Sequence, residues 1–214
     1  MRERVSAAAL RAGHPARVLA VSKTKPASSI RELAGFGQVE FGENYVQEAL
    51  AKQRELGDLR LQWHLIGPLQ SNKCREVSEH FDWLESMDRE KLIAPLNRYR
   101  PDPGPPLNVL IQVNIDAEAS KSGCEPGAIA GLARRVAEAP RLLLRGLMAI
   151  PQPHPDLDVR RAAFRRMREL FDDLRNHYPS ADTLSLGMSD DFELAIEEGA
   201  TLVRIGTALF GARQ

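Results

Sequence analysis

The sequence of 214 residues lacks a long hydrophobic run, and no stretch approaches the roughly 20 apolar residues of a membrane-spanning helix. Its first segment, MRERVSAAALRAGHP, has an apolar stretch too short for the core of a signal peptide. Net charge is also absent, because 29 basic residues balance 29 acidic ones, so no overall field attracts nucleic acid or an anionic membrane. We therefore expect a cytoplasmic protein that binds neither nucleic acid nor membranes and has a small-molecule partner.

Cysteine is scarce as well. The chain has two cysteines, Cys74 and Cys124, which form neither a CxxC motif nor a cluster with histidine. This arrangement argues against a disulfide framework and against a zinc site. We expect no bound metal.

Lysine supplies only six of the 29 basic residues, and two of the six stand in VLAVSKTKP, residues 18–26. A hydrophobic run of strand length ends there on Lys23. A charge in that position must be paired, neutralised or used in chemistry, because burying an unpaired charge is very costly. Lys23 shares the alternation of Leu19 and Val21, which predicts that all three point to the same side of the strand. We interpret the nearby Lys25 as a solvent-facing lysine.

Short runs rich in Val, Ile and Leu alternate along the chain with longer segments of helical periodicity. The expected strands cover residues 17–22, 39–43, 61–67, 81–87, 108–114, 142–150, 183–187 and 202–207. The expected helices cover residues 27–36, 45–56, 72–80, 89–99, 126–138, 158–177 and 190–199. Strict alternation predicts parallel strands with right-handed crossovers, and eight such units close a barrel. The predicted fold is an α/β single (β/α)8 TIM barrel, one domain over residues 1–214.

Two proline-rich segments bear on this organisation. In a barrel, RPDPGPP (100–106) joins a helix to the fifth strand on the face opposite the active site, and PQPHP (151–155) follows the sixth strand on the active face. The alternative makes RPDPGPP a linker between two domains of about 100 residues each, a size within the usual range. We prefer one barrel because eight strands suit it.

Polar and glycine residues gather at the ends of the expected strands, where barrel enzymes carry their chemistry. These ends are Ser22-Lys23, Gly42-Glu43-Asn44, Gly67, Asn114, Gly187-Met188-Ser189-Asp190-Asp191 and Gly206-Thr207. Simpler interpretations exist for several of them. Asn44 with Gln47 and Asp190 with Glu193 fit capping boxes that merely start helices. His64, inside an apolar strand, is interpreted as a hydrogen-bonded core residue.

The chemistry of this rim favours one kind of ligand. A desolvated lysine has a lowered pKa, and its neutral amine can form a Schiff base with an aldehyde. Small residues and backbone N–H groups around Ser189, Gly206 and Thr207 form a cradle suited to phosphate. Pyridoxal 5′-phosphate (PLP) carries both an aldehyde and a phosphate.

The same residues carry a family resemblance. Six motifs in order resemble the PLP-binding protein family, also called the PLP homeostasis protein family, which is similar to the N-terminal barrel of alanine racemase, the fold-type III arrangement. The motifs are LAVSKTKP (19–26), FGENYVQE (41–48), WHLIGPLQSNK (63–73), RGLMAIP (145–151), SLGMSDDFELAI (185–196) and VRIGTALFG (203–211). The chain departs from the family at its start, where the N-terminal helix is shortened.

The resemblance implies cofactor-binding residues and no catalytic residue: Lys23, Asn44, Met188, Ser189, Arg204, Gly206 and Thr207. By that resemblance Lys23 holds PLP as an internal aldimine, Arg204 is the partner of the pyridine nitrogen, and Asn44 lines the pocket. The remaining four surround the phosphate.

Three functions remain open at this stage. The first is a monomeric PLP carrier or regulator in intracellular PLP homeostasis, which supplies PLP-dependent apoenzymes and has little or no turnover. The second is a single-domain PLP-dependent amino-acid racemase, and the third is a Schiff-base aldolase without a cofactor. Racemisation needs an acid/base group on each face of the substrate Cα, and Lys23 serves only one. Among the tyrosines only Tyr45 is expected near the rim, and we expect no room for a second domain before Gln214, so the first function is preferred.

Overall fold

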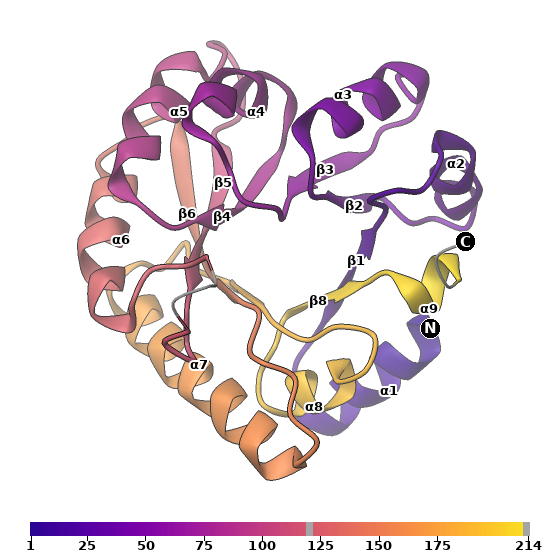
Figure 1. Ribbon diagram of the computed structural model, residues 1–214, viewed down its shortest axis with the longest axis vertical. Helices are drawn as coiled ribbons and strands as arrows, with labels where there is room; N and C mark the ends of the chain where they lie inside the picture. The colour runs from indigo at the N-terminus through magenta and orange to yellow at the C-terminus, as the bar shows by residue number, and fades with distance from the viewer. Residues whose placement is uncertain (119–121, 212–214) are drawn as a thin grey trace.

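The computed structural model describes residues 1–118 and 122–211 and contains a closed barrel of parallel strands (Figure 1). The strands, each hydrogen-bonded to the next and the last to the first, are β1 (Arg17–Val21), β2 (Glu40–Glu43), β3 (Gln62–Leu65), β4 (Trp83–Met87), β5 (Leu107–Val113), β6 (Leu142–Ala149), β7 (Thr183–Ser185) and β8 (Leu202–Ile205). The predicted (β/α)8 barrel is confirmed.

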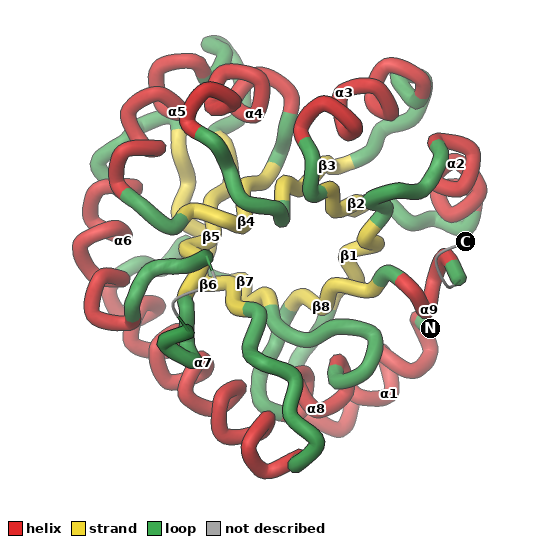
Figure 2. Tube along the Cα trace, in the orientation of Figure 1, coloured by secondary structure: helices red, strands yellow, loops and turns green. Residues whose placement is uncertain are grey.

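Helices alternate with the strands, beginning with one before β1, and surround the barrel on its outside (Figure 2). They are α1 (Arg2–Ala12), α2 (Ala27–Gly35), α3 (Val46–Glu55), α4 (Cys74–His80), α5 (Ile93–Tyr99), α6 (Ile129–Ala137), α7 (Leu157–His177), α8 (Phe192–Glu197) and α9 (Thr207–Phe210), with 3-10 turns η1 (Ser71–Lys73), η2 (Glu90–Leu92) and η3 (Pro126–Ala128). Each predicted helix is present within a few residues of its expected bounds. None of the helices in residues 1–118 and 122–211 is both long and apolar enough to cross a membrane.

Apolar periodicity did not predict the helix α1. It buries Val5 and Ala8 and lies against α8. Arg4 donates from Nη2 to Glu193 at 3.0 Å and places its guanidinium 4.9 Å from the centre of the Phe192 ring. Its apolar residues form no clear stripe, because Leu10 is exposed and only Val5 and Ala8 are buried.

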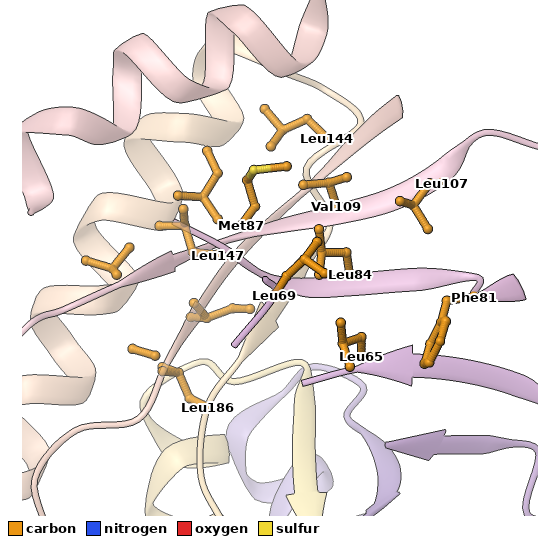
Figure 3. Close-up of a cluster of buried hydrophobic side chains, with 14 of the residues drawn as sticks. Leu65, Leu69, Phe81, Leu84, Met87, Leu107, Val109, Leu144, Leu147 and Leu186 are labelled. Carbon is orange, nitrogen blue, oxygen red and sulfur yellow. The ribbon is translucent and has the colours of Figure 1, made fainter. Parts of the chain in front are cut away.

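Most of the buried apolar residues form one cluster that includes outward-facing side chains of the strands and the inner sides of the helices. Figure 3 shows part of it, including Leu84, Val109 and Leu147 from three consecutive strands. The apolar stripe of α7, formed by Phe164, Met167, Phe171 and Leu174, is buried in this layer. This layer holds the helices against the barrel, because apolar burial contributes about 25 cal/mol per Å².

The amino end of the barrel is filled from inside. Trp83 forms a small separate cluster with Leu110 and Met148. Two guanidinium groups stack on the Trp83 ring, that of Arg145 at 4.8 Å and that of Arg17 at 5.6 Å from its centre. These five side chains form what we call the basal plug.

Candidate functional site

Adjacent strands bring the predicted site residues to one arc of the carboxyl rim. Val21 at the end of β1 pairs with Gly42 of β2. On the other side of β1, a Cβ atom built on Gly206 would lie 3.5 Å from the Cβ of Val21. The strand β7 lies next to β8, so the segment 187–191 continues the same arc. Lys23 therefore stands between the end of β8 and the end of β2.

The alternation predicted for β1 is confirmed for Leu19 and Val21, and the orientation of the Lys23 side chain stays a prediction. Leu19 pairs with Arg204 of β8, and a Cβ on Gly42, the partner of Val21, would approach Leu19 Cδ2 to 3.0 Å, so Leu19 and Val21 share the inner side of the barrel. Lys23 is half-buried at the rim beyond them. The solvent-facing interpretation of Lys25 is wrong: it is half-buried, and its Nζ donates to the Phe210 carbonyl oxygen at 3.3 Å.

Asn44 follows β2 and is half-buried. The capping interpretation is wrong, because Tyr45 is the N-cap residue of α3 and no side-chain cap bond forms. Asn44 instead packs closely on the chain after β3, where a Cβ on Gly67 would lie 2.2 Å from the Asn44 carbonyl oxygen. Only glycine fits at position 67, so the two strand ends meet tightly and Asn44 stays at the rim.

The turn after β7 presents Met188 and Ser189. Gly187 has φ of 83°, and a Cβ there would lie 2.5 Å from that of Ala195, so glycine is needed for this turn. The Met188 N–H donates to Asp191 Oδ1 at 2.7 Å. The capping box predicted from Asp190 is wrong, because Asp191 is the N-cap of α8. Met188 is exposed and Ser189 half-buried at the rim.

The end of β8 differs from its prediction. The strand stops at Ile205, Gly206 is an N-cap, and Thr207 is the first residue of α9 rather than the last of the strand. The Gly206 carbonyl accepts from Leu209 N at 2.9 Å, whereas the first N–H groups of a helix have no acceptor within it. The exposed Thr207 hydroxyl and these N–H groups can therefore serve a ligand at the rim.

Arg204 lies inside the barrel as part of a polar cluster that periodicity did not reveal. Its Nη1 donates to the Ser185 hydroxyl at 2.7 Å and to the Ser185 carbonyl at 2.8 Å, and its Nη2 donates to the Ala149 carbonyl at 2.7 Å. The Ser185 hydroxyl donates to Glu85 Oε2 at 2.6 Å. Among the described residues no acceptor is bonded to Arg204 Nε.

Glu85 provides the negative charge of this cluster. It is fully buried, and His64 Nδ1 lies 2.7 Å from its Oε1. Burial alone raises the pKa of Glu85, but the hydrogen bond and charge of His64, the charge of Arg204 and the bond from Ser185 together lower it. Burial also lowers the pKa of Arg204, yet a guanidinium remains charged at neutral pH. Glu85 is therefore a carboxylate that balances Arg204.

His64 is the core residue that the sequence indicated. It is buried, and its ring stacks on Trp83 with centres 5.0 Å apart and planes 6° apart. Its Nε2 lies 3.7 Å from Glu40 Oε1. His64 thus connects the Arg204 cluster to the basal plug.

The groups on this arc fit a ligand that carries a phosphate, an aldehyde and an aromatic nitrogen. Lys23 offers an amine at the rim, and Ser189 and Thr207 offer hydroxyls nearby in the arc. Arg204 can only donate hydrogen bonds, which suits an accepting ring nitrogen. Among residues 1–118 and 122–211, no group of His, Cys, Asp or Glu could hold a metal ion.

Comparison with known proteins gives a consistent result. A family model described as "Alanine racemase, N-terminal domain" matches residues 1–214. The pyridoxal phosphate homeostasis protein of Pseudomonas aeruginosa is 58% identical over 213 residues, covering 98% of this chain and 91% of that protein. The Escherichia coli protein of the same name is 55% identical over 219 residues, covering 100% and 94%. The PLP-bound structure of PipY from Synechococcus elongatus is 40% identical, with a TM-score of 0.84, over 98% of this chain and 99% of that chain.

Proposed function

Because this chain belongs to the alanine racemase N-terminal domain family, we propose that it is a PLP-binding protein that serves intracellular PLP homeostasis. The observation that carries the proposal is the PLP-bound structure of PipY, to which this chain is similar over 98% of its length. The names of the two bacterial relatives support the homeostasis role. The proposal includes one barrel domain over residues 1–214, a monomer in the cytoplasm, with PLP-dependent apoenzymes as partners.

We assign the contacts of PLP to this chain's residues as follows. Lys23 holds the cofactor covalently, Arg204 donates to the ring nitrogen, and Asn44 lines the pocket. The phosphate is held by residues on two neighbouring turns: Met188, Ser189, Gly206 and Thr207. When bound, PLP supplies an aldehyde that reacts with amines.

Two features of the chain support a role without efficient turnover. Arg204 cannot accept a proton from the ring nitrogen or give one up at physiological pH, so it keeps that nitrogen unprotonated and the ring a poor electron sink. Racemisation also needs a second acid/base group opposite Lys23. Tyr45 is 61% exposed at the start of α3, and Tyr99 and Tyr178 lie at the carboxyl ends of α5 and α7, which lead away from the rim.

The proposal is tested with the PLP-loaded protein in two separate assays, one of PLP transfer to an apoenzyme and one of alanine racemisation. We expect it to reactivate an apo PLP enzyme faster or further than an equal amount of free PLP does. We expect alanine enantiomers to keep their optical activity in its presence. Rapid loss of optical activity without such reactivation would favour the racemase, and a purified active protein without visible absorbance would favour the cofactor-free aldolase.

The phosphate contacts give a further expected result. Ser189→Ala and Thr207→Val should each weaken PLP binding by roughly tenfold or more, because each removes a charge-assisted hydrogen bond worth about 1.5–3 kcal/mol. Titration of PLP by absorbance measures the affinity, and circular dichroism checks the fold. Ser6→Ala, on the exposed side of α1, is the matched control. If both site variants bind PLP as the wild type does, their hydroxyls do not contact the phosphate.

A further inference from the structure

The turn that carries Lys23 is held on both sides of that residue. Ser22 N–H donates to the Gly42 carbonyl at 3.0 Å, and Lys25 N–H donates back to the Ser22 carbonyl at 3.0 Å. Thr24 has φ of 64°, in the left-handed region that residues other than glycine, asparagine and aspartate rarely adopt. A backbone in this conformation persists only where its surroundings fix it.

Three side chains beneath the turn provide that fixation. Lys52 of α3 places Nζ 2.7 Å from the Ser22 carbonyl oxygen, 2.7 Å from Glu43 Oε1 and 2.6 Å from Glu48 Oε1. Glu48 Oε1 also accepts from the Thr24 N–H at 2.6 Å. The network thus bonds the residue before Lys23 through its carbonyl and the residue after Lys23 through its amide.

Ser22 is bonded a second time through its side chain. Its hydroxyl donates to Glu43 Oε1 at 2.6 Å, and both side chains are fully buried. Lys52 is 6% exposed. Burial raises the pKa of Glu43, against the opposing effects of Lys52 and Ser22. Burial at this position disfavours the charged form of Glu43, and the bonds from Lys52 and Ser22 oppose that effect.

Stability alone does not account for such a network. Replacing a buried ion pair with apolar residues of similar volume is often neutral or stabilising. The charged groups fix the geometry of the turn, because they bond the Ser22 carbonyl, the Ser22 hydroxyl and the Thr24 amide. Ammonium and carboxylate groups together determine where the Cα of Lys23 stands relative to the rim.

We infer that Lys52 and Glu48, together with Glu43, are positioning residues that set Lys23 for covalent attachment of PLP. The inference rests on the proposed function, since it concerns how the same lysine reacts. Lys52 and Glu48 bond the backbone on either side of Lys23, and Glu43 bonds the Ser22 hydroxyl and Lys52. They belong to the outer side of the barrel wall, between β1, β2 and α3.

The test uses Glu48→Ala, because Glu48 is partly exposed and Lys52 keeps Glu43 as its counter-charge. We expect roughly tenfold weaker covalent attachment of PLP, the usual effect of losing a charge-assisted hydrogen bond. Attachment is measured by borohydride trapping followed by mass spectrometry across a PLP titration. Glu48→Gln keeps an acceptor oxygen for the Thr24 amide and should recover part of the loss. The control is Glu79→Ala, which removes a similarly exposed carboxylate paired with Arg75 at 2.9 Å on α4.

Repeating the Glu48→Ala measurement in the Lys23→Ala variant separates a positioning role from a general structural role. In Lys23→Ala, PLP binds only without covalent attachment, so adding Glu48→Ala should leave its affinity unchanged. An equal loss in that background, or full attachment in Glu48→Ala alone, would overturn the positioning role while leaving the proposed function in place. Absence of PLP attachment to the wild-type protein would instead contradict the proposed function and with it this inference.

Discussion

Lys23→Ala is expected to abolish covalent attachment of PLP, while Lys25→Ala retains most of it. Lys23 stands directly after β1, where the alternation of Leu19 and Val21 predicts an inward side chain, whereas the Lys25 amine donates to the Phe210 carbonyl at 3.3 Å. The measurement is borohydride reduction of the PLP-loaded protein followed by peptide mapping. PLP should still bind Lys23→Ala weakly through its phosphate and ring contacts.

The two lysines are close enough in sequence to serve as each other's control. Both are half-buried and both flank Thr24, so a general disturbance of the turn would affect the two variants alike. A reduced PLP label found mainly on Lys25 in the wild-type protein would show that the assignment of Lys23 is incorrect.

Glu85→Gln is expected to destabilise the PLP-free protein by about 3–5 kcal/mol, the usual cost of removing one partner of a buried charge pair. The reason is that Arg204, 3% exposed, then lacks the carboxylate to which it is coupled through Ser185. Denaturant unfolding measures the change. Because the pKa of Glu85 is lowered from 4.5, its stabilising effect is complete above that value and is lost as the pH falls further.

A double-mutant cycle shows whether the two charges act together. Arg204→Met alone should be similarly destabilising, but combined with Glu85→Gln it should cost less than the sum, since no unpaired charge remains. Arg100→Met is the control, because the buried Arg100 guanidinium donates to the carbonyls of Ser78, Phe81 and Pro105. Additive effects of Glu85→Gln and Arg204→Met would mean that Glu85 does not balance Arg204.

Much of the barrel could be predicted because most strands are short apolar runs, each followed by a segment of helical periodicity. The stripe of α7 is an example, since Phe164, Met167, Phe171 and Leu174 are all large and buried. The pattern did not reveal the first helix. The helix α1 buries only Val5 and Ala8, and its partners in α8 lie at the other end of the sequence.

The candidate site, too, could be predicted only in part. Residues of the rim could be proposed because the ends of parallel strands lie at one end of a barrel. The capping interpretations of Asn44 and Asp190 failed because spacing does not specify where a helix begins. The cluster around Glu85 joins strands from distant parts of the chain. The sequence signals for it were His64 in its apolar strand and the charged residue inside the apolar run WLESM, and nothing local identified Arg204 as a partner of Glu85.

The basal plug fills the amino end of the barrel, where the guanidinium groups of Arg17 and Arg145 lie on the Trp83 ring. A ligand bound at the carboxyl rim would therefore enter and leave on the rim side. Under the proposed function, a protein that took PLP directly from this barrel would have to dock on the same face at which PLP was first bound.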